Sequence, residues 1–115
     1  MKVEITLGEE FKRQFKLLAK KYHSLTNDLI AFKAELIKNP LQGDDLGCGI
    51  RKVRMAISSK GRGKSGGARV LTLNVLVNEM DTTNVVLLTI YDKSEIDNVS
   101  DNYIKWLVEQ YRTKR

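Results

Sequence analysis

The sequence predicts an α+β fold with the element order β-α-α-β-β-β-α, in which an N-terminal helical hairpin packs on a mainly antiparallel four-stranded sheet and a C-terminal helix follows. Three patterns predict it: an alternating apolar segment at the N-terminus, two helical periods directly after it, and three strand-like segments before a last helical period. The 115 residues, 42% of them hydrophobic, suffice for one modest core. We therefore expect a single domain over residues 1–115.

The N-terminal part of the chain predicts a strand and then two helices. Apolar and polar residues alternate from position 2 to position 7, and Gly8 breaks the pattern. Two apolar stripes at helical spacing follow, formed by Phe11, Phe15, Leu18 and Tyr22 and by Leu25, Leu29, Phe32 and Leu36. The short break after Tyr22 predicts an antiparallel helical hairpin. Pro40 ends the second helix, because proline disfavours the helical conformation for the residue before it.

The second half of the chain predicts most of the sheet. Residues 41–49 are rich in turn-forming types and are expected to be a connection. Three strand-like segments follow, at residues 50–57, 69–77 and 85–91, with residues 78–84 as a hairpin connection between the last two. From Ser100 the pattern predicts a capped helix whose apolar stripe contains Ile104, Leu107, Val108 and Tyr111.

The net charge of +6 comes from one segment of the chain. Residues 47–77 contain seven cations and no acidic residue, namely Arg51, Lys52, Arg54, Lys60, Arg62, Lys64 and Arg69. A concentrated positive charge indicates a polyanionic partner such as nucleic acid. The alternative is a solvated surface, but such surfaces usually mix charges of both signs.

The strand pattern predicts where these cations lie. Lys52 and Arg54 are two residues apart in one strand, so they point to the same side. Arg69 begins the returning strand and can lie beside them across the hairpin, while Tyr91 and Lys93 end the last strand at the same edge. We expect the seven cations to converge on a concave surface that binds RNA backbone.

Other classes of site are disfavoured. Gly63-Lys64-Ser65 resembles part of a nucleotide-binding P-loop, but Ser58 stands where that motif needs its first glycine, and a strand follows instead of a helix. One histidine and one cysteine are poor material for a metal site, so neither metal nor cofactor is expected. The lone Cys48 excludes an internal disulfide. With no apolar run long enough to cross a membrane and no signal peptide pattern, we expect a cytoplasmic protein.

The motif residues resemble those of a known family. A Lys-Val-Arg strand at 52–54, the Lys-Ser-Gly-Gly-Ala-Arg-Val sequence at 64–70 and the Ile-Tyr-Asp-Lys-Ser-Glu sequence at 90–95 are similar to the RelE/ParE toxin superfamily. The nearest branch is that of the HigB-like and RelE-like mRNA interferases of type II toxin-antitoxin systems. The resemblance covers nearly the whole chain. It implies a RelE-like toxin domain that is neutralised by a cognate helix-turn-helix, HigA-like antitoxin, acts on the ribosome and mRNA, and contacts operator DNA indirectly through the antitoxin complex.

The resemblance also implies a reaction and roles for the site residues. The reaction is ribosome-dependent, metal-independent mRNA cleavage, in which the ribose 2′-hydroxyl attacks the scissile phosphate. It implies Lys52 as the base with Arg54 as its neighbour and alternate, Arg69 on the phosphate, Lys93 as further charge or proton donor to the leaving oxygen, and Tyr91 in base stacking or proton transfer. Arg51, Lys60, Arg62 and Lys64 would contact RNA backbone. A catalytic tyrosine that some members carry in the final segment is absent from residues 96–100, and Tyr103 comes later.

Two alternative functions use the same scaffold. One is a ParE-like toxin that poisons DNA gyrase, and the other is a non-catalytic RNA-binding or ribosome-binding module. The lysine-bearing basic strand favours RNA cleavage, because gyrase poisoning needs no phosphodiester chemistry. At the level of single residues, the alternative for Arg69 is an ion pair with an acid such as Asp92, and the alternative for Tyr91 is a packing role with a hydrogen-bonded hydroxyl.

Overall fold

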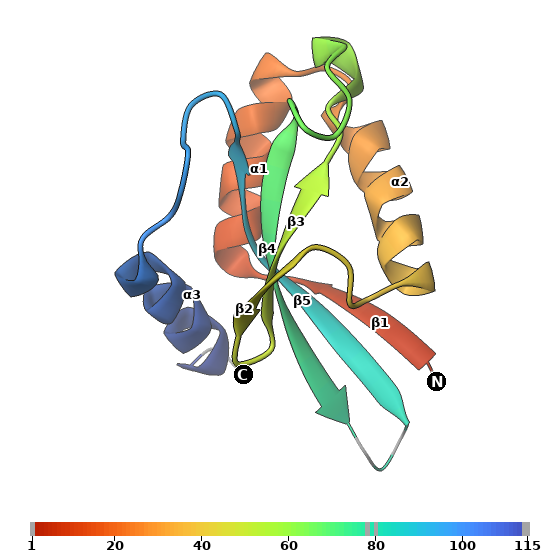
Figure 1. Cartoon of the computed structure of the whole chain (residues 1–115), viewed down its shortest axis with the longest axis vertical. Helices are drawn as coiled ribbons and strands as arrows, with labels where there is room; N and C mark the ends of the chain where they lie inside the picture. Colours follow the sequence, from red (N-terminus) through yellow and green to blue (C-terminus); the bar gives the residue numbers. More distant parts are fainter. Residues whose placement is uncertain (1, 78, 80, 114–115) are drawn as a thin grey trace.

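The computed structural model describes residues 2–77, 79 and 81–113. Its elements are β1 (Lys2–Leu7), α1 (Glu9–Lys21), α2 (Leu25–Lys38), β2 (Asp44–Gly47), β3 (Ile50–Met55), the short 3-10 helix η1 (Ser58–Lys60), β4 (Ala68–Val77), β5 (Thr82–Asp92) and α3 (Asp101–Thr113). The strands form one sheet in the order β1-β5-β4-β3-β2 (Figure 1). The predicted α+β class, the helical hairpin and the C-terminal helix are confirmed.

The sheet differs from the expected one in its strand number and direction. It is a mixed sheet of five strands, because β1 pairs in parallel with β5 while the other neighbours pair antiparallel. The additional strand is β2, which lies in the segment expected to be only a connection. Asp44 pairs with Lys52 of β3, and glycines with positive φ at Gly43, Gly47 and Gly49 allow the chain to turn at both ends of this exposed strand. A strand this short and polar carries no alternating pattern that a sequence could reveal.

The connection between β4 and β5 is also shorter than expected. Thr82, Thr83 and Asn84 belong to β5, where each pairs with β1 on one side and β4 on the other. Pairing on both sides outweighs the turn-like appearance of this segment, and threonine is a favourable strand residue. Residues 78 and 80 of the expected connection lie outside the described residues.

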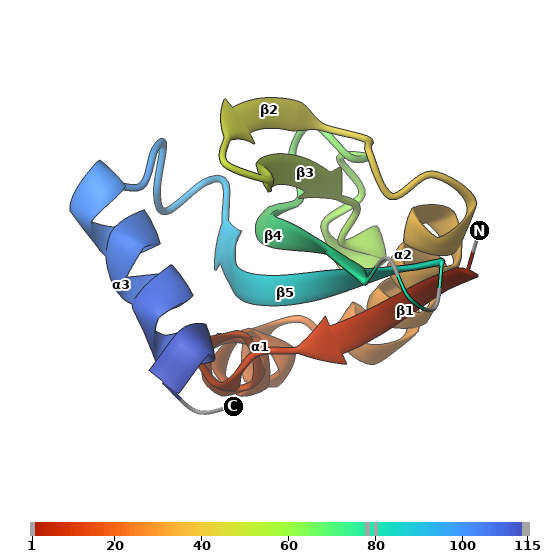
Figure 2. The same ribbon diagram turned by 90° about the horizontal axis from the view of Figure 1, so that it is seen from below.

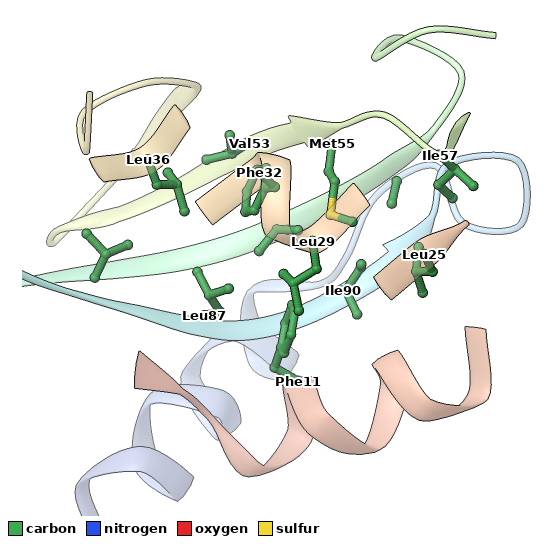
Figure 3. Close-up of a cluster of buried hydrophobic side chains, with 13 residues drawn as sticks. Phe11, Leu25, Leu29, Phe32, Leu36, Val53, Met55, Ile57, Leu87 and Ile90 are labelled. Atoms are coloured by element: carbon green, nitrogen blue, oxygen red, sulfur yellow. The ribbon is translucent and has the colours of Figure 1, made fainter. Parts of the chain in front are cut away.

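The hydrophobic core has two parts, one on each face of the sheet. Helices α1 and α2 run in opposite directions and cover one face, where Phe11, Leu25 and Phe32 pack against β3, β4 and β5 (Figure 3). Helix α3 packs on the other face, where Leu107 contacts a smaller cluster. The Oγ of Ser100 accepts a hydrogen bond from the backbone N–H of Tyr103 at 3.1 Å, so the predicted cap of this helix is present.

The face opposite α1 and α2 is only partly covered. Helix α3 packs beside β5, while the sheet curls so that β2 and β3 rise on the far side (Figure 2). Between them lies a groove of about 620 Å³, lined by residues that include Leu46, Ile50, Lys52, Ile104 and Val108. This concave face is where the basic strand residues are found. No helix in the described part of the chain is long and apolar enough to span a bilayer.

Candidate functional site

Three site residues form a row across the middle of the sheet. Arg54 of β3 pairs directly with Arg69 of β4, and Arg69 pairs with Tyr91 of β5. Lys52 lies two residues before Arg54 and therefore on the same face. The prediction that Lys52, Arg54 and Arg69 lie together is confirmed.

These cations line a shallow polar pocket of about 350 Å³. Its lining consists of Gln42, Gly43, Asp44, Lys52, Val53, Arg54, Lys64 and Arg69. Lys52 also lines the larger groove beneath α3, so the two hollows meet at this side chain. A cationic pocket that opens into a partly apolar groove can hold a phosphate with the adjoining nucleoside beside it.

Arg69 is the most enclosed of these cations. Only 6% of the residue is exposed, and its guanidinium donates three hydrogen bonds to backbone carbonyls: Nη1 to Lys64 and Ala68 at 3.3 and 3.1 Å, and Nη2 to Ser65 at 3.1 Å. A guanidinium has five N–H groups, so about two remain without a protein acceptor among the described residues. Burial and the nearby Arg54 lower the pKa of Arg69. The group is thus a fixed cation with donors to spare, which suits phosphate recognition.

Cations outnumber acids around the pocket, whose lining contains four basic residues and Asp44. No carboxylate among the described residues lies within ion-pair distance of Lys52, Arg54 or Arg69. Asp44, opposite Lys52 on β2, raises the pKa of Arg69 only as a lesser influence. The alternative that Arg69 pairs with Asp92 is wrong, because Asp92 lies on the other face and binds a different cation.

Tyr91 is buried beside Arg69. The residue is 6% exposed, and the Tyr91 Oη makes no hydrogen bond with any described residue. Burial raises the pKa of this phenol, and the positive charge of Arg69 opposes the rise. A ring this enclosed cannot stack on a nucleobase without rearrangement, so its chemistry is that of a protonated hydroxyl beside Arg69. Tyr103, by contrast, bonds to Thr89 at 3.0 Å and to Glu10 at 3.4 Å, between β5 and α1.

Only four of the seven cations line the pocket, namely Lys52, Arg54, Lys64 and Arg69, so the expectation that all seven converge is wrong. Arg51 points to the opposite face because side chains alternate along a strand, and its guanidinium donates to the backbone carbonyls of Gln42 and Gly43 at 3.0 and 3.1 Å. Lys60 lies under the loop, where its side chain is only 10% exposed and its Nζ is 2.8 Å from the carboxylate of Asp92. Neither side chain is free to meet RNA at the pocket.

The glycine-rich loop of residues 61–67 borders the pocket. Arg62 and Lys64 are exposed in it, and Lys64 forms an ion pair with Glu35 of α2 at 3.0 Å. Gly67 lies so close to β3 that a Cβ atom there would be 2.3 Å from the carbonyl oxygen of Met55. Its own carbonyl accepts the backbone N–H of the half-buried Lys93 at 3.1 Å, which ties the loop to the end of β5.

Some contributors to the site were not predicted from the sequence. The wall formed by Gln42, Gly43 and Asp44 depends on the edge strand β2, for which the sequence carries no pattern. Lys60 is buried because it pairs with Asp92, which is distant in sequence. The one sequence signal for this pair is that Asp92 is a charged residue at the end of the buried strand β5. In the described part of the chain, no group of histidine, cysteine, aspartate and glutamate residues could hold a metal ion.

Comparison with known families gives a match over most of the chain. The family model described as the RelE toxin of the RelE / RelB toxin-antitoxin system matches residues 9–113, which extend from the first residue of α1 to the last residue of α3. The match therefore includes the cationic row, the glycine-rich loop and the groove. The chain belongs to the RelE toxin family.

Proposed function

We propose that this toxin is a ribosome-dependent endoribonuclease that cleaves mRNA and thereby stops translation. The observation that carries the proposal is the row formed by Arg54, Arg69 and Tyr91, with Lys52 beside it. Lys52, Arg54 and Arg69 line a polar pocket and form no ion pair with a described residue. Tyr91 lies next to Arg69, with a buried hydroxyl that makes no hydrogen bond with a described residue. Cleavage of a phosphodiester needs charge stabilisation at the phosphoryl oxygens, a base and a proton donor, and these residues can supply all three.

The proposed reaction is an internal transesterification. Lys52, as the neutral amine, takes the proton of the ribose 2′-hydroxyl and becomes an ammonium, with Arg54 as its neighbour and alternate, and the 2′-oxygen forms a bond to phosphorus. The bond from phosphorus to the 5′-oxygen breaks, which leaves a 2′,3′-cyclic phosphate and a 5′-hydroxyl. Arg69 holds the phosphoryl oxygens with its two free N–H groups. Lys93 gives the proton to the leaving oxygen, or Tyr91 does so after a rearrangement that exposes its buried hydroxyl, and no metal takes part.

The wider surroundings of the pocket fit contact with a polynucleotide. Arg62 and Lys64 on the exposed loop lie where RNA backbone or ribosomal RNA would pass. The groove beneath α3 provides apolar surface beside Lys52 for a nucleoside. The loop sequence supports assignment to the HigB-like branch, and residues 1–115 would act as one toxin domain in the cytoplasm.

Membership of the family implies an antitoxin partner. We propose that this partner is a helix-turn-helix, HigA-like protein, through which the toxin contacts operator DNA only indirectly. A protein that neutralises the toxin would either cover the cationic row or hold it out of the ribosome. Coexpression of an adjacent gene for a small helix-turn-helix protein should abolish the toxicity of the chain.

The test uses purified toxin, translating ribosomes and a defined mRNA. Primer extension should reveal new 5′ ends that appear only when toxin and translating ribosomes are both present. A DNA gyrase supercoiling assay with the same preparation should show no effect. Translation that stops without shortened transcripts would contradict the nuclease and favour a binding module, and inhibited supercoiling would favour a gyrase poison.

A further inference from the structure

We propose that Asp92, together with Lys60 and Tyr22, positions the cationic site without contacting RNA. These residues and Ser94 form the Asp92 cluster, which lies on the opposite face of the sheet from the pocket. The inference rests on the proposed nuclease function. It gives Lys60, one of the seven cations of residues 47–77, the role of fixing the geometry of the site.

The carboxylate of Asp92 is completely buried and fully hydrogen-bonded. Its side chain is 0% exposed, and one oxygen accepts from the Nζ of Lys60 and the Oγ of Ser94, both at 2.8 Å, and from the backbone N–H of Ser94 at 3.0 Å. The other oxygen accepts from the hydroxyl of Tyr22 at 2.5 Å. A carboxylate with this many donors is held firmly in one position.

The position of Asp92 links it to the site by two routes. It directly follows Tyr91 and directly precedes Lys93, so its anchoring fixes the end of β5. Through Lys60 it also fixes the start of the glycine-rich loop. The carbonyls of that loop at residues 64 and 65 accept the hydrogen bonds of Arg69, so the loop sets the direction of the guanidinium.

A second carboxylate, on α2, secures η1, which leads into the glycine-rich loop. Asp28 is 8% exposed and accepts from the backbone N–H of Ser58 at 3.0 Å and from the hydroxyl of Ser24 at 2.7 Å. It also accepts a hydrogen bond from the Ser58 hydroxyl. With both carboxylates in place, η1 is fixed at its first residue by Asp28 and at its last residue by Asp92.

Such anchoring has a reason in the electrostatics of the site. Arg54 and Arg69 repel each other across β3 and β4, and like charges in opposed positions favour a rearrangement that separates them. A buried ion pair is seldom more stabilising than apolar packing, but it fixes geometry because each partner has few acceptable positions. The cluster therefore keeps Arg69 and Tyr91 in register against that repulsion.

The test compares cleavage by Lys60→Met, Asp92→Asn and Tyr22→Phe with that by the unchanged protein, using single-turnover cleavage on ribosomes programmed with mRNA. Misplacement of catalytic groups lowers the rate of the chemical step. We expect the rate constant at saturating toxin to fall about tenfold or more in Lys60→Met and Asp92→Asn, and about threefold in Tyr22→Phe, in line with how far each disturbs the geometry. The toxin concentration for half-saturation should stay within about twofold, because no RNA contact is removed.

The control is Lys12→Met, which removes an exposed ion pair with Glu9 of 3.1 Å outside the site. Its rate constant should equal that of the unchanged protein. A folded Lys60→Met protein that cleaves at the unchanged rate would overturn the inference, as would a weaker half-saturation with an unchanged rate constant. If Lys60→Met does not fold, an unchanged rate constant in Tyr22→Phe overturns it. Absence of cleavage by the unchanged protein would instead refute the proposed function.

Discussion

Arg54 and Arg69 lie directly opposite each other on the neighbouring antiparallel strands β3 and β4, and their side chains share one face of the sheet. Two cations in this arrangement destabilise the folded state, and Arg54 contributes to the lowered pKa of Arg69. The free protein therefore carries a repulsion that a bound phosphate would relieve. The same pair of arginines that would bind a phosphate thus lowers the stability of the free protein.

Neutralising Arg54 should therefore stabilise the free protein while it weakens RNA binding. In Arg54→Gln we expect the free energy of unfolding to rise by about 0.5 kcal/mol, because the opposed charge is removed. Urea denaturation followed by circular dichroism measures it. The comparison is Arg13→Gln, which loses a salt bridge of 2.7 Å with Glu10 and should gain no stability. Lower stability of Arg54→Gln than of the unchanged protein would contradict the repulsion.

Replacing Arg69 by lysine should reduce cleavage far more than binding. A lysine keeps the charge but cannot hold the carbonyls of the loop and two phosphoryl oxygens at once. For Arg69→Lys we expect the single-turnover rate constant to fall about 100-fold, the usual effect of losing a donor that stabilises transition-state charge. Arg13→Lys serves as the control on α1. Retention of more than about one third of the unchanged rate in Arg69→Lys would argue against a phosphate contact.

Arg62, one of the two exposed cations of the loop, should contribute to binding in a salt-dependent way. We measure the slope of log affinity against log salt with a 2′-deoxy oligonucleotide, which cannot be cleaved. In Arg62→Gln this slope should become less steep by the contribution of about one phosphate contact. Arg51→Gln should leave the slope unchanged, because Arg51 lies on the other face and binds backbone carbonyls. Equal changes in both variants would mean that the RNA path extends beyond the concave face.

The sequence predicted the cationic row because the row depends on simple periodicity. Alternation along a strand places Lys52 and Arg54 together, and a hairpin returns Arg69 beside them. The same alternation implied that Arg51 faces the other way. The expectation that all seven cations converge was based on their number in one segment and left this alternation out. The side on which each residue of a strand lies can thus be predicted from the sequence, provided that the alternation is followed for every residue of that strand.

The parts of the site that sequence reasoning missed depend on contacts between distant segments. In the sequence, Lys60 looks like one more cation of the loop. Its partner Asp92 is 32 residues away, and only the fold brings the two together. The edge strand containing Asp44 is short, polar and exposed, so its pairing with β3 is decided by tertiary position and turn geometry. Neither feature leaves a local signature in the amino-acid order.

The core beneath the site should dominate stability, and α2 offers a matched comparison. Phe32 is 2% exposed between the sheet and the helices, so Phe32→Ala should lower the free energy of unfolding by about 3–5 kcal/mol. Ile37, five residues further along the same helix, is 53% exposed, and Ile37→Ala should change it by less than about 0.5 kcal/mol. Urea denaturation of both proteins decides this. A large loss in Ile37→Ala would mean that this exposed face is covered in solution.

Acid should unfold the protein partly through Asp92. Hydrogen bonds from Lys60, Tyr22 and Ser94 overcome the opposing effect of burial and hold the pKa of Asp92 well below its ordinary value. In the unfolded chain an aspartate has a pKa of about 3.9, so as the pH falls the unfolded chain binds a proton before the folded protein does. The contribution of Asp92 to stability is therefore present above that pH and is lost as the pH falls below it. Stability measured by urea denaturation from pH 6 down to about pH 2.5 should fall less steeply in Asp92→Asn than in the unchanged protein. The exposed Asp97→Asn should keep the unchanged slope. Parallel curves for Asp92→Asn and the unchanged protein would mean that the carboxylate is not held ionised in the folded state.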